Sequence, residues 1–126
     1  MTTTSRTIIP VYTSRGDAEA FLVNSYLYNR MGEWIGWVTP EQEVYSVLGY
    51  YVGYFSKEPR ILRQGAFNPP KQKRIPPPAP LTIYPPATVP LAPMMSELLT
   101  GTVDVLLEEP ERLHTCDSGE FRKDLE

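Results

Sequence analysis

The chain has 126 residues and a net charge of −3, which leaves room for one compact domain with extensions and argues against a general nucleic-acid binder. Its single cysteine, Cys116, excludes an intrachain disulfide and suits a reducing compartment. The N-terminal sequence lacks the apolar stretch of a signal peptide, and no run approaches the roughly 18 apolar residues of a membrane span. We therefore expect a cytoplasmic protein.

A repeating unit occupies the first half of the chain, and 12 of the 14 aromatic residues lie between Tyr12 and Phe67. Its glycines are separated by 16, 17 and 16 residues, and each follows the start of a short apolar pair such as Leu27-Tyr28 by five positions. In the first three copies a small residue and then an aromatic come four positions after the glycine. Self-similarity of this kind is a stronger indicator of fold than any single residue. The repeat glycines are Gly16, Gly32, Gly49 and Gly65, and the small residues include Gly36 and Gly53.

Each copy predicts a strand, a tight turn and a second strand. The first turn positions, Thr13, Asn29 and Ser46, are of the types that begin a type I turn. The glycine at the end supplies the positive φ of a three-residue hairpin with a bulge. In the fourth copy the first position is Leu62, which weakens the turn signal there.

Gly36 and Gly53 lie inside the second strands of their copies. Glycine at such a place indicates either close approach of another backbone or a sharp bend. Because an isolated hairpin is only marginally stable, several must pack together, either radially or as a linear solenoid. About four short units favour a closed ring.

The segments VYTSRGDAEAFL, LYNRMGEWIGWV and VYSVLGYYVGYF resemble the petals of the bacterial four-fold beta-flower domain. The resemblance covers roughly residues 8–68 and implies about four hairpins around a pseudo-fourfold axis. It carries no established activity or catalytic residues. The fourth copy departs from the pattern because it runs into Asn68-Pro69-Pro70, where proline cannot donate to a ladder. We therefore expect a domain over residues 1–68 whose ring is incomplete or is closed by another segment.

Residues 69–93 contain ten of the fourteen prolines and predict an extended, polyproline-like connector. Within it, Arg74, Pro77 and Pro80 have the spacing of a ligand for aromatic grooves such as those of SH3 domains. A structural connector is the simpler interpretation of such a proline-rich run. Its apolar residues would be costly to leave in water, so we expect it to pack on its own domain or on a second subunit.

Residues 94–113 complete the predicted order of all-β repeats, extended segment, and short C-terminal helix and strand. A helix is expected over 94–100, ended by Gly101, and a strand over 102–107. That strand would complete the open ring or pair with another chain. Residues 114–126 are polar enough to be disordered.

Catalytic and metal sites are not expected from the residue inventory. One histidine, His114, and one cysteine, Cys116, cannot supply the ligands of a zinc site, so we predict no metal and no cofactor. With Asp117 they form a local cluster that could be read as a nucleophile with its base, but a solvated tail is the simpler interpretation. The acidic pairs, such as Glu41 with Glu43, are interpreted as solvent-facing charges rather than as a general acid and base.

The aromatic residues of the repeats offer a further alternative. With basic neighbours they could form a stacking platform for single-stranded nucleic acid, although aromatics are also what a small β-core needs. The basic stretch 57–74 could instead contact the acidic segment 97–126 of the same molecule. The residues of this alternative are Trp34, Trp37, Tyr50, Tyr51 and Tyr54, with Lys57, Arg60 and Arg63.

The sequence thus favours a non-enzymatic, all-β protein that acts through protein contacts and forms a homo-oligomer. A protein partner or self-association is expected, and nucleic acid and membrane are not. The alternatives are single-stranded nucleic-acid binding by the aromatic and basic residues, and small-ligand binding in a pocket on the petal axis.

Overall fold

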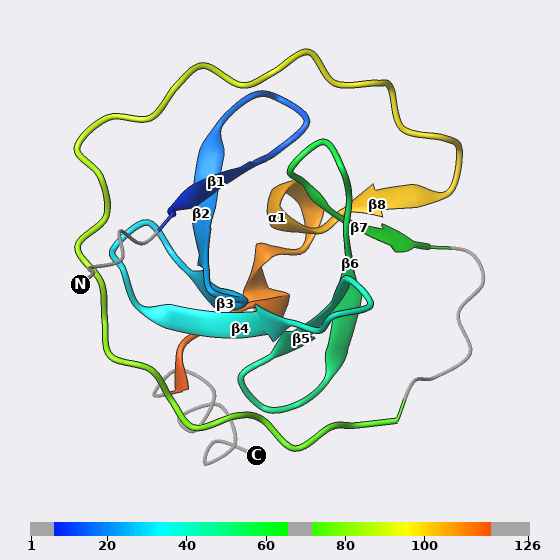
Figure 1. The fold of residues 1–126 in the computed structure, drawn as a ribbon. Helices are drawn as coiled ribbons and strands as arrows, with labels where there is room; N and C mark the ends of the chain where they lie inside the picture. The colour runs from blue at the N-terminus through cyan, green and yellow to red at the C-terminus, as the bar shows by residue number, and fades with distance from the viewer. Residues whose placement is uncertain (1–6, 66–71, 117–126) are drawn as a thin grey trace.

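The computed structural model describes residues 7–65 and 72–116. It contains one antiparallel, strongly curled sheet in which every strand pairs with its neighbours in sequence, in the order β1 to β8 (Figure 1). The prediction of an all-β fold is confirmed. The strands are β1 (Ile9–Tyr12), β2 (Ala18–Val23), β3 (Tyr26–Tyr28), β4 (Trp34–Val38), β5 (Glu43–Ser46), β6 (Tyr51–Phe55), β7 (Ile61–Gln64) and β8 (Thr102–Asp104).

The predicted glycine turns form in the first three hairpins. In the second, the amide of Gly32 donates to the carbonyl of Asn29 at 3.0 Å, and the amide of Asn29 donates to the carbonyl of Glu33 at 2.8 Å. The Asn29 side chain also accepts from the amides of Met31 and Glu33, as expected for the first position of such a turn. Gly16, Gly32 and Gly49 have φ of +92°, +85° and +95°, and the strand register shifts beside each turn.

The same turn also occurs between β4 and β5 without a glycine. The amide of Gln42 donates to the carbonyl of Thr39 at 2.8 Å, and Gln42 has a φ of +69°. A left-handed residue other than glycine costs roughly 1–2 kcal/mol. Sequence reasoning missed this turn because it relied on glycine as the marker.

The glycines inside strands lie where backbones crowd one another. A β-carbon on Gly36 would lie 2.5 Å from the carbonyl oxygen of Tyr45, and one on Gly53 would overlap the carbonyl oxygen of Leu62. The expectation of close backbone approach at Gly36 and Gly53 is confirmed.

The fourth hairpin is completed by a strand from much later in the chain. β8 pairs antiparallel with β7, with Leu62 opposite Asp104, and the amide of Gly65 donates to the carbonyl of Gly101 at 2.6 Å. Of the two alternatives for the 102–107 strand, the chain thus uses the one within the molecule. Residues 66–71, where the fourth copy departs from the pattern, lie outside the described residues.

Two local predictions at the C-terminal end are wrong. The strand expected over 102–107 stops at Asp104, whose carboxylate accepts from the amide of Leu107 and begins the short helix α1 (Val105–Glu108), followed by the 3-10 helix η1 (Pro110–Arg112). The helix expected over 94–100 does not form, and that stretch is extended. Seven residues are too few for a helix to persist without tertiary support, and Ser96 bonds the β6–β7 turn instead.

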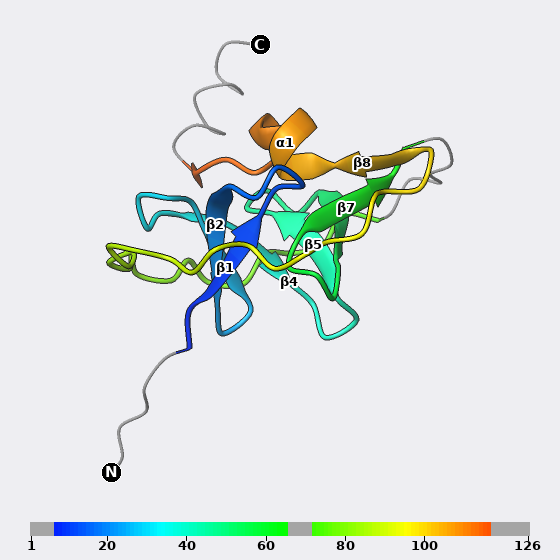
Figure 2. The same cartoon turned by 90° about the horizontal axis from the view of Figure 1, so that it is seen from above.

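The inside of the curled sheet is an aliphatic core. Residues from strands β1 to β7 meet Val105 and Leu106 of α1 and Leu113, which lie over one end of the sheet (Figure 2). A second cluster is aromatic and includes Tyr28, Trp34, Trp37 and Tyr45. The first cluster consists of Val11, Ala20, Leu27, Ile35, Val38, Val44, Val52, Ile61, Val105, Leu106 and Leu113, each at most 8% exposed.

Candidate functional site: the belt and the hairpin tips

Residues 72–100 form an extended segment that runs around the outside of the sheet, which we call the belt (Figures 1 and 2). It connects the fourth copy of the repeat to β8. Instead of taking a direct path between the neighbouring strands β7 and β8, it passes the other three hairpins (Figure 1). Their turns, residues 13–17, 29–33 and 46–50, are the hairpin tips. The belt and the tips together are the candidate functional site, because most of the exposed large apolar side chains of the described chain lie on the belt.

The belt contacts the repeat glycines at each tip. The amide of Arg74 donates to the carbonyl of Gly49 at 2.9 Å, and the amide of Ile83 donates to the carbonyl of Gly32 at 3.0 Å. At the first tip the contact is steric, because a β-carbon on Gly16 would lie 3.7 Å from that of Ala92. The nearby Tyr12 hydroxyl donates to the carbonyl of Pro90 at 2.7 Å.

The contacts recur every nine residues along the belt. Positions 74, 83 and 92 meet the third, second and first tips, and position 101 meets Gly65 in the fourth hairpin. Nine residues of polyproline II span about 28 Å in three turns. Successive contacts therefore fall after a whole number of polyproline II turns, on the same side of the belt.

One face of the belt is directed toward the domain. The half-buried residues of the belt are Pro76, Pro77, Pro80, Ile83, Pro85, Ala92, Met95 and Leu98, and no residue of the belt is fully buried. Within this set, positions 77, 80 and 83 and positions 92, 95 and 98 have the three-residue spacing of a polyproline II helix lying on a surface. Of the three residues of the SH3-type motif, Pro77 and Pro80 lie on this inward face, whereas Arg74 is exposed.

The opposite face of the belt is apolar and exposed. Six large side chains have exposed fractions of 79–97%, which monomeric proteins rarely display in one segment. They are Ile75 (93%), Leu81 (88%), Tyr84 (96%), Leu91 (95%), Met94 (97%) and Leu99 (79%).

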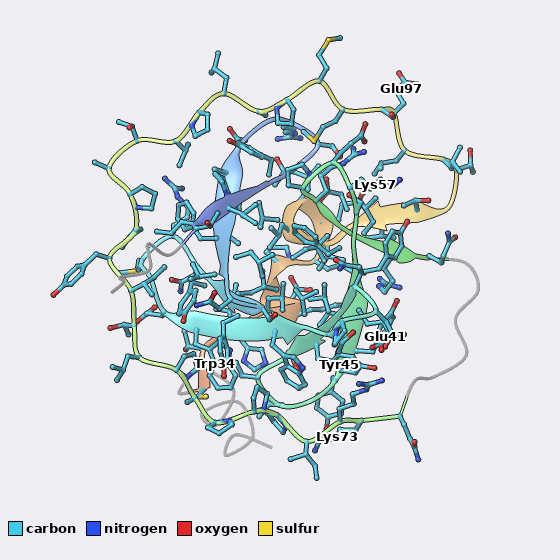
Figure 3. The ribbon with its side chains drawn as sticks, viewed as in Figure 1. Trp34, Glu41, Tyr45, Lys57, Lys73 and Glu97 are labelled. Atoms are coloured by element: carbon cyan, nitrogen blue, oxygen red, sulfur yellow. The ribbon has the colours of Figure 1, made fainter. Side chains whose placement is uncertain are left out.

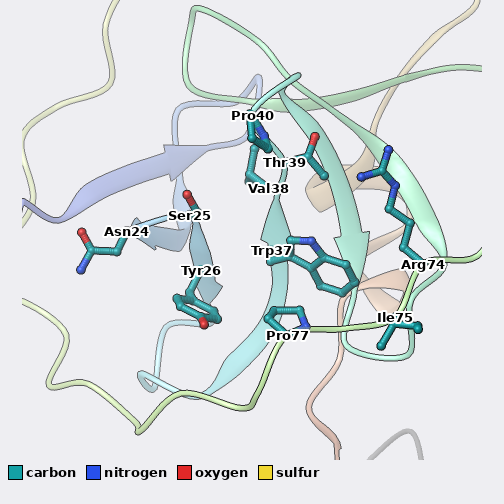
Figure 4. A pocket seen from close by; sticks show the side chains of 10 residues that line it. All are labelled: Asn24, Ser25, Tyr26, Trp37, Val38, Thr39, Pro40, Arg74, Ile75 and Pro77. Atoms are coloured by element: carbon teal, nitrogen blue, oxygen red, sulfur yellow. The ribbon is translucent and has the colours of Figure 1, made fainter.

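A cavity of about 390 Å³ lies between the start of the belt and the sheet (Figure 4). Trp37 and Tyr26, which are cross-strand partners, line it on the sheet side, and Pro77 lines it on the belt side. Arg74 is at its edge and is already engaged, since its guanidinium lies 5.2 Å from the ring centre of Tyr45 and 3.6 Å from a carboxylate oxygen of Glu43. A smaller cavity of about 200 Å³ lies beneath residues 85–89.

The aromatic and basic residues do not form an exposed platform. Trp34 and Trp37 are only 8% and 9% exposed. Tyr54 is half-buried, and Tyr50 is 55% exposed with the ammonium of Lys73 5.0 Å from its ring centre (Figure 3). The two tryptophans are therefore buried and the Tyr50 ring already contacts a cation, so this set is only partly available to stack with bases.

The two arginines of the nucleic-acid alternative, Arg60 and Arg63, form ion pairs within the molecule. Arg60 pairs with Glu58 at 2.7 Å, and Arg63 pairs with Glu109 at 2.5 Å. The hydrogen bond from Arg63 is the main cause that lowers the pKa of Glu109. Arg63 belongs to the basic stretch 57–74 and Glu109 to the acidic segment 97–126. This ion pair is therefore a contact between the two segments within one molecule.

A polar cluster joins the belt to three parts of the sheet. Ser14, in the first hairpin tip, donates from its amide and its hydroxyl to the buried carboxylate of Asp104 at 2.7 and 2.6 Å. Arg60 donates to the Ser14 hydroxyl at 2.9 Å. On the other side of Arg60, Glu58 accepts from the amide and hydroxyl of Ser96 in the belt.

This cluster is suited to holding segments together. The Ser14 hydroxyl donates to the Asp104 carboxylate and accepts from the Arg60 guanidinium, so its hydrogen-bonding capacity is used to join residues of the cluster. The Ser96 amide is the largest cause that lowers the pKa of Glu58, followed by the Ser96 hydroxyl. The contact between belt and sheet is therefore strongest when Glu58 is ionised.

The residues of the C-terminal cluster are only partly described. A ring nitrogen of His114 lies 3.0 Å from the carbonyl oxygen of Thr115, and Cys116 packs against the aromatic cluster. Asp117 lies outside the described residues. Within residues 7–65 and 72–116, no three His, Cys, Asp or Glu side chains lie close enough together to hold a metal ion, and no helix there is long and apolar enough to cross a membrane.

No family model matches the chain. Neither a curated protein nor a solved structure matches it.

Proposed function

We propose that this chain is a non-enzymatic protein-interaction module of the beta-flower type, in which four hairpins are arranged around a pseudo-fourfold axis. The fourth petal is β7 with β8, and the belt displays the interaction surface. The observation that carries the proposal is the row of apolar belt side chains that are 79–97% exposed. Burying such side chains against a partner contributes roughly 25 cal/mol per Å² of apolar area.

The partner we propose is a second copy of the chain. Lys73 lies beside Ile75 at the start of the belt, and Glu97 lies between Met94 and Leu99 near its end. Figure 3 places Lys73 and Glu97 on opposite sides of the molecule. One copy can thus present a basic, apolar stretch to the acidic, apolar stretch of the next. Such a head-to-tail contact forms a ring or a filament according to its rotation.

Sedimentation velocity over a wide range of protein concentration tests the proposal. The wild-type chain is expected to form oligomers whose size rises with concentration, and a variant with Leu81→Ser, Tyr84→Ser and Leu91→Ser is expected to stay monomeric. Met31→Ser is the control, because Met31 is 74% exposed on a hairpin tip and not on the belt. A wild-type chain that remains monomeric at every concentration would refute self-association.

Charge exchange tests the head-to-tail geometry. Lys73→Glu alone and Glu97→Lys alone place like charges at the contact and are each expected to weaken association. Combining the two substitutions restores opposite charges between neighbouring copies. Association that fails to recover in the double variant would refute this geometry while leaving the apolar contribution testable by the triple serine variant.

The cavity beside Trp37 supports a second candidate function, small-ligand binding. Its volume of about 390 Å³ falls in the usual range for ligand sites, and Trp37, Tyr26 and Pro77 favour a flat apolar molecule. Indole and its N-methyl derivative are suitable probes. A saturable heat of binding in isothermal titration calorimetry that is lost in Pro77→Gly supports this function, and no saturable heat opposes it.

A further inference from the structure

The second and third hairpin tips contact the belt through its backbone. The residues at the four contact positions are Arg74, Ile83 and Ala92 of the belt and Gly101, which directly follows it, and their side chains have no chemistry in common. At the second and third tips the contact is a hydrogen bond from a belt amide to the carbonyl of a tip glycine. What these positions share is a nine-residue spacing on one face of an extended chain.

The tip glycines also shape the surface on which the belt lies. A β-carbon on Gly32 would overlap the carbonyl oxygen of Ile83, and one on Gly49 would overlap that of Arg74. The absence of a side chain at these tips therefore opens a path for a peptide backbone. Glycine commonly marks such close approach of a backbone to its ligand.

We propose that the hairpin tips form a binding track for an extended, proline-rich peptide, and that the belt of a second copy can occupy the track in place of the chain's own belt. This goes beyond the proposed function, which uses the outer face of the belt, because the track lies beneath its inner face. Exchange of an identical segment forms the same contacts between copies as within one copy.

The belt is suited to such exchange. None of its residues is fully buried, and the hydrogen bonds from Arg74, Ile83 and Ser96 attach it at widely spaced points. The chain's own belt has an effective concentration near the millimolar range. It therefore excludes a second belt in dilute solution, and loosening it makes the track accessible.

The test uses the full chain with Arg74→Pro and Ile83→Pro. Proline removes the two amide donors and is compatible with an extended polyproline backbone. Each lost hydrogen bond is expected to weaken attachment of the chain's own belt roughly five-fold. The glycine tips that form the track are unchanged.

The probe is a fluorescent synthetic peptide with the sequence of residues 72–101, and binding is measured by fluorescence anisotropy. We expect it to bind the double proline variant at least about ten-fold more tightly than the wild-type chain. A matched peptide with N-methylated amides at positions 74 and 83 keeps every side chain and is expected to lose that binding. Adding Gly32→Ala to the variant, which blocks the second tip, should also weaken binding, whereas Gly16→Ala should not.

Equal binding of the two peptides, or no binding of either, would overturn the proposal. If the double variant does not fold by circular dichroism, the single Ile83→Pro variant is used with the same pair of peptides and the same criterion. A peptide carrying Leu81→Ser, Tyr84→Ser and Leu91→Ser separates this proposal from the proposed function. It should bind the track normally, because those side chains point outward, even though the same changes in the full chain should abolish self-association.

Discussion

The carbonyl oxygen of Ile83 lies where a side chain on Gly32 would have to begin. The amide of the same Ile83 donates to the carbonyl of Gly32 at 3.0 Å. Gly32 is therefore required twice, once by the positive φ of its turn and once by the belt that passes over it. Gly49 stands in the same relation to Arg74.

The two requirements at Gly32 can be separated with Gly16 as the reference. The φ angles are similar, +85° and +92°, but a β-carbon on Gly16 would have only an ordinary contact with Ala92. We predict that Gly16→Ala lowers the free energy of unfolding by about 1–2 kcal/mol through the left-handed backbone alone. Gly32→Ala should have this cost and also detach the belt at Ile83, which faster hydrogen exchange of the Ile83 amide would detect. Equal exchange rates of this amide in the two variants would contradict a belt contact at Gly32.

A second prediction concerns Gly36, where the crowding comes from a neighbouring strand. Its β-carbon would lie 2.5 Å from the backbone oxygen of Tyr45 and 2.9 Å from the Leu113 side chain. Because a sheet backbone cannot withdraw as the belt can, Gly36→Ala should lower the free energy of unfolding in urea by about 3 kcal/mol. Ala20 occupies the corresponding position of the first copy and is fully buried. Ala20→Gly should cost only about 1 kcal/mol, and a comparable cost for both changes would argue against backbone crowding.

The turns and the strands around them could be predicted because their causes are local. Asn29 bonds amides two and four residues ahead, so the sequence near the turn already determines its shape. The residues after Gly65 behave differently. The pairing of β8 with β7 places Leu62 opposite Asp104, and these residues are far apart in sequence. The local sequence around β7 therefore does not show which strand pairs with it.

The errors near the C-terminus have the same origin. Val103 and Val105 favour a strand, yet Asp104 caps α1 and bonds Ser14 in the first hairpin tip. The acidic residue before an apolar run was a signal for a helix start that could have been used. The nine-residue spacing of the belt contacts could not have been found in this way, because the residues at those positions differ and contact the tips largely through their backbones.

Asp104 provides the third prediction. Its fully buried carboxylate accepts two hydrogen bonds from Ser14 and one from Leu107. It therefore joins the first hairpin tip to the end of the last strand. Asp104→Ala should lower the free energy of unfolding by about 2 kcal/mol, because it removes the charged acceptor of the hydrogen bonds from Ser14 and also removes the helix cap.

Asp104→Asn is the informative comparison. The amide can still cap α1 with its oxygen but cannot accept both bonds from Ser14 with the strength of a carboxylate. A double-mutant cycle with Ser14→Ala isolates the contact between the two residues. We expect a coupling free energy of about 1–2 kcal/mol between the substitutions Asp104→Asn and Ser14→Ala. Strictly additive effects of the two substitutions would show that the contact between Asp104 and Ser14 contributes little to stability.

The fourth prediction is that acid detaches the belt at Ser96. The hydrogen bonds from Ser96 lower the pKa of Glu58 in the folded protein. A carboxylate with a depressed pKa stabilises the contact fully above its unfolded-state pKa, and this stabilisation is lost as the pH falls through the folded-state pKa.

The amide resonance of Ser96 in NMR spectra should therefore shift in one step on the acidic side of the ordinary glutamate range. Glu58→Gln should abolish that step, whereas Glu97→Gln, which changes the neighbouring belt residue, should preserve it. A Ser96 resonance that titrates identically in Glu58→Gln would show that another group controls this end of the belt.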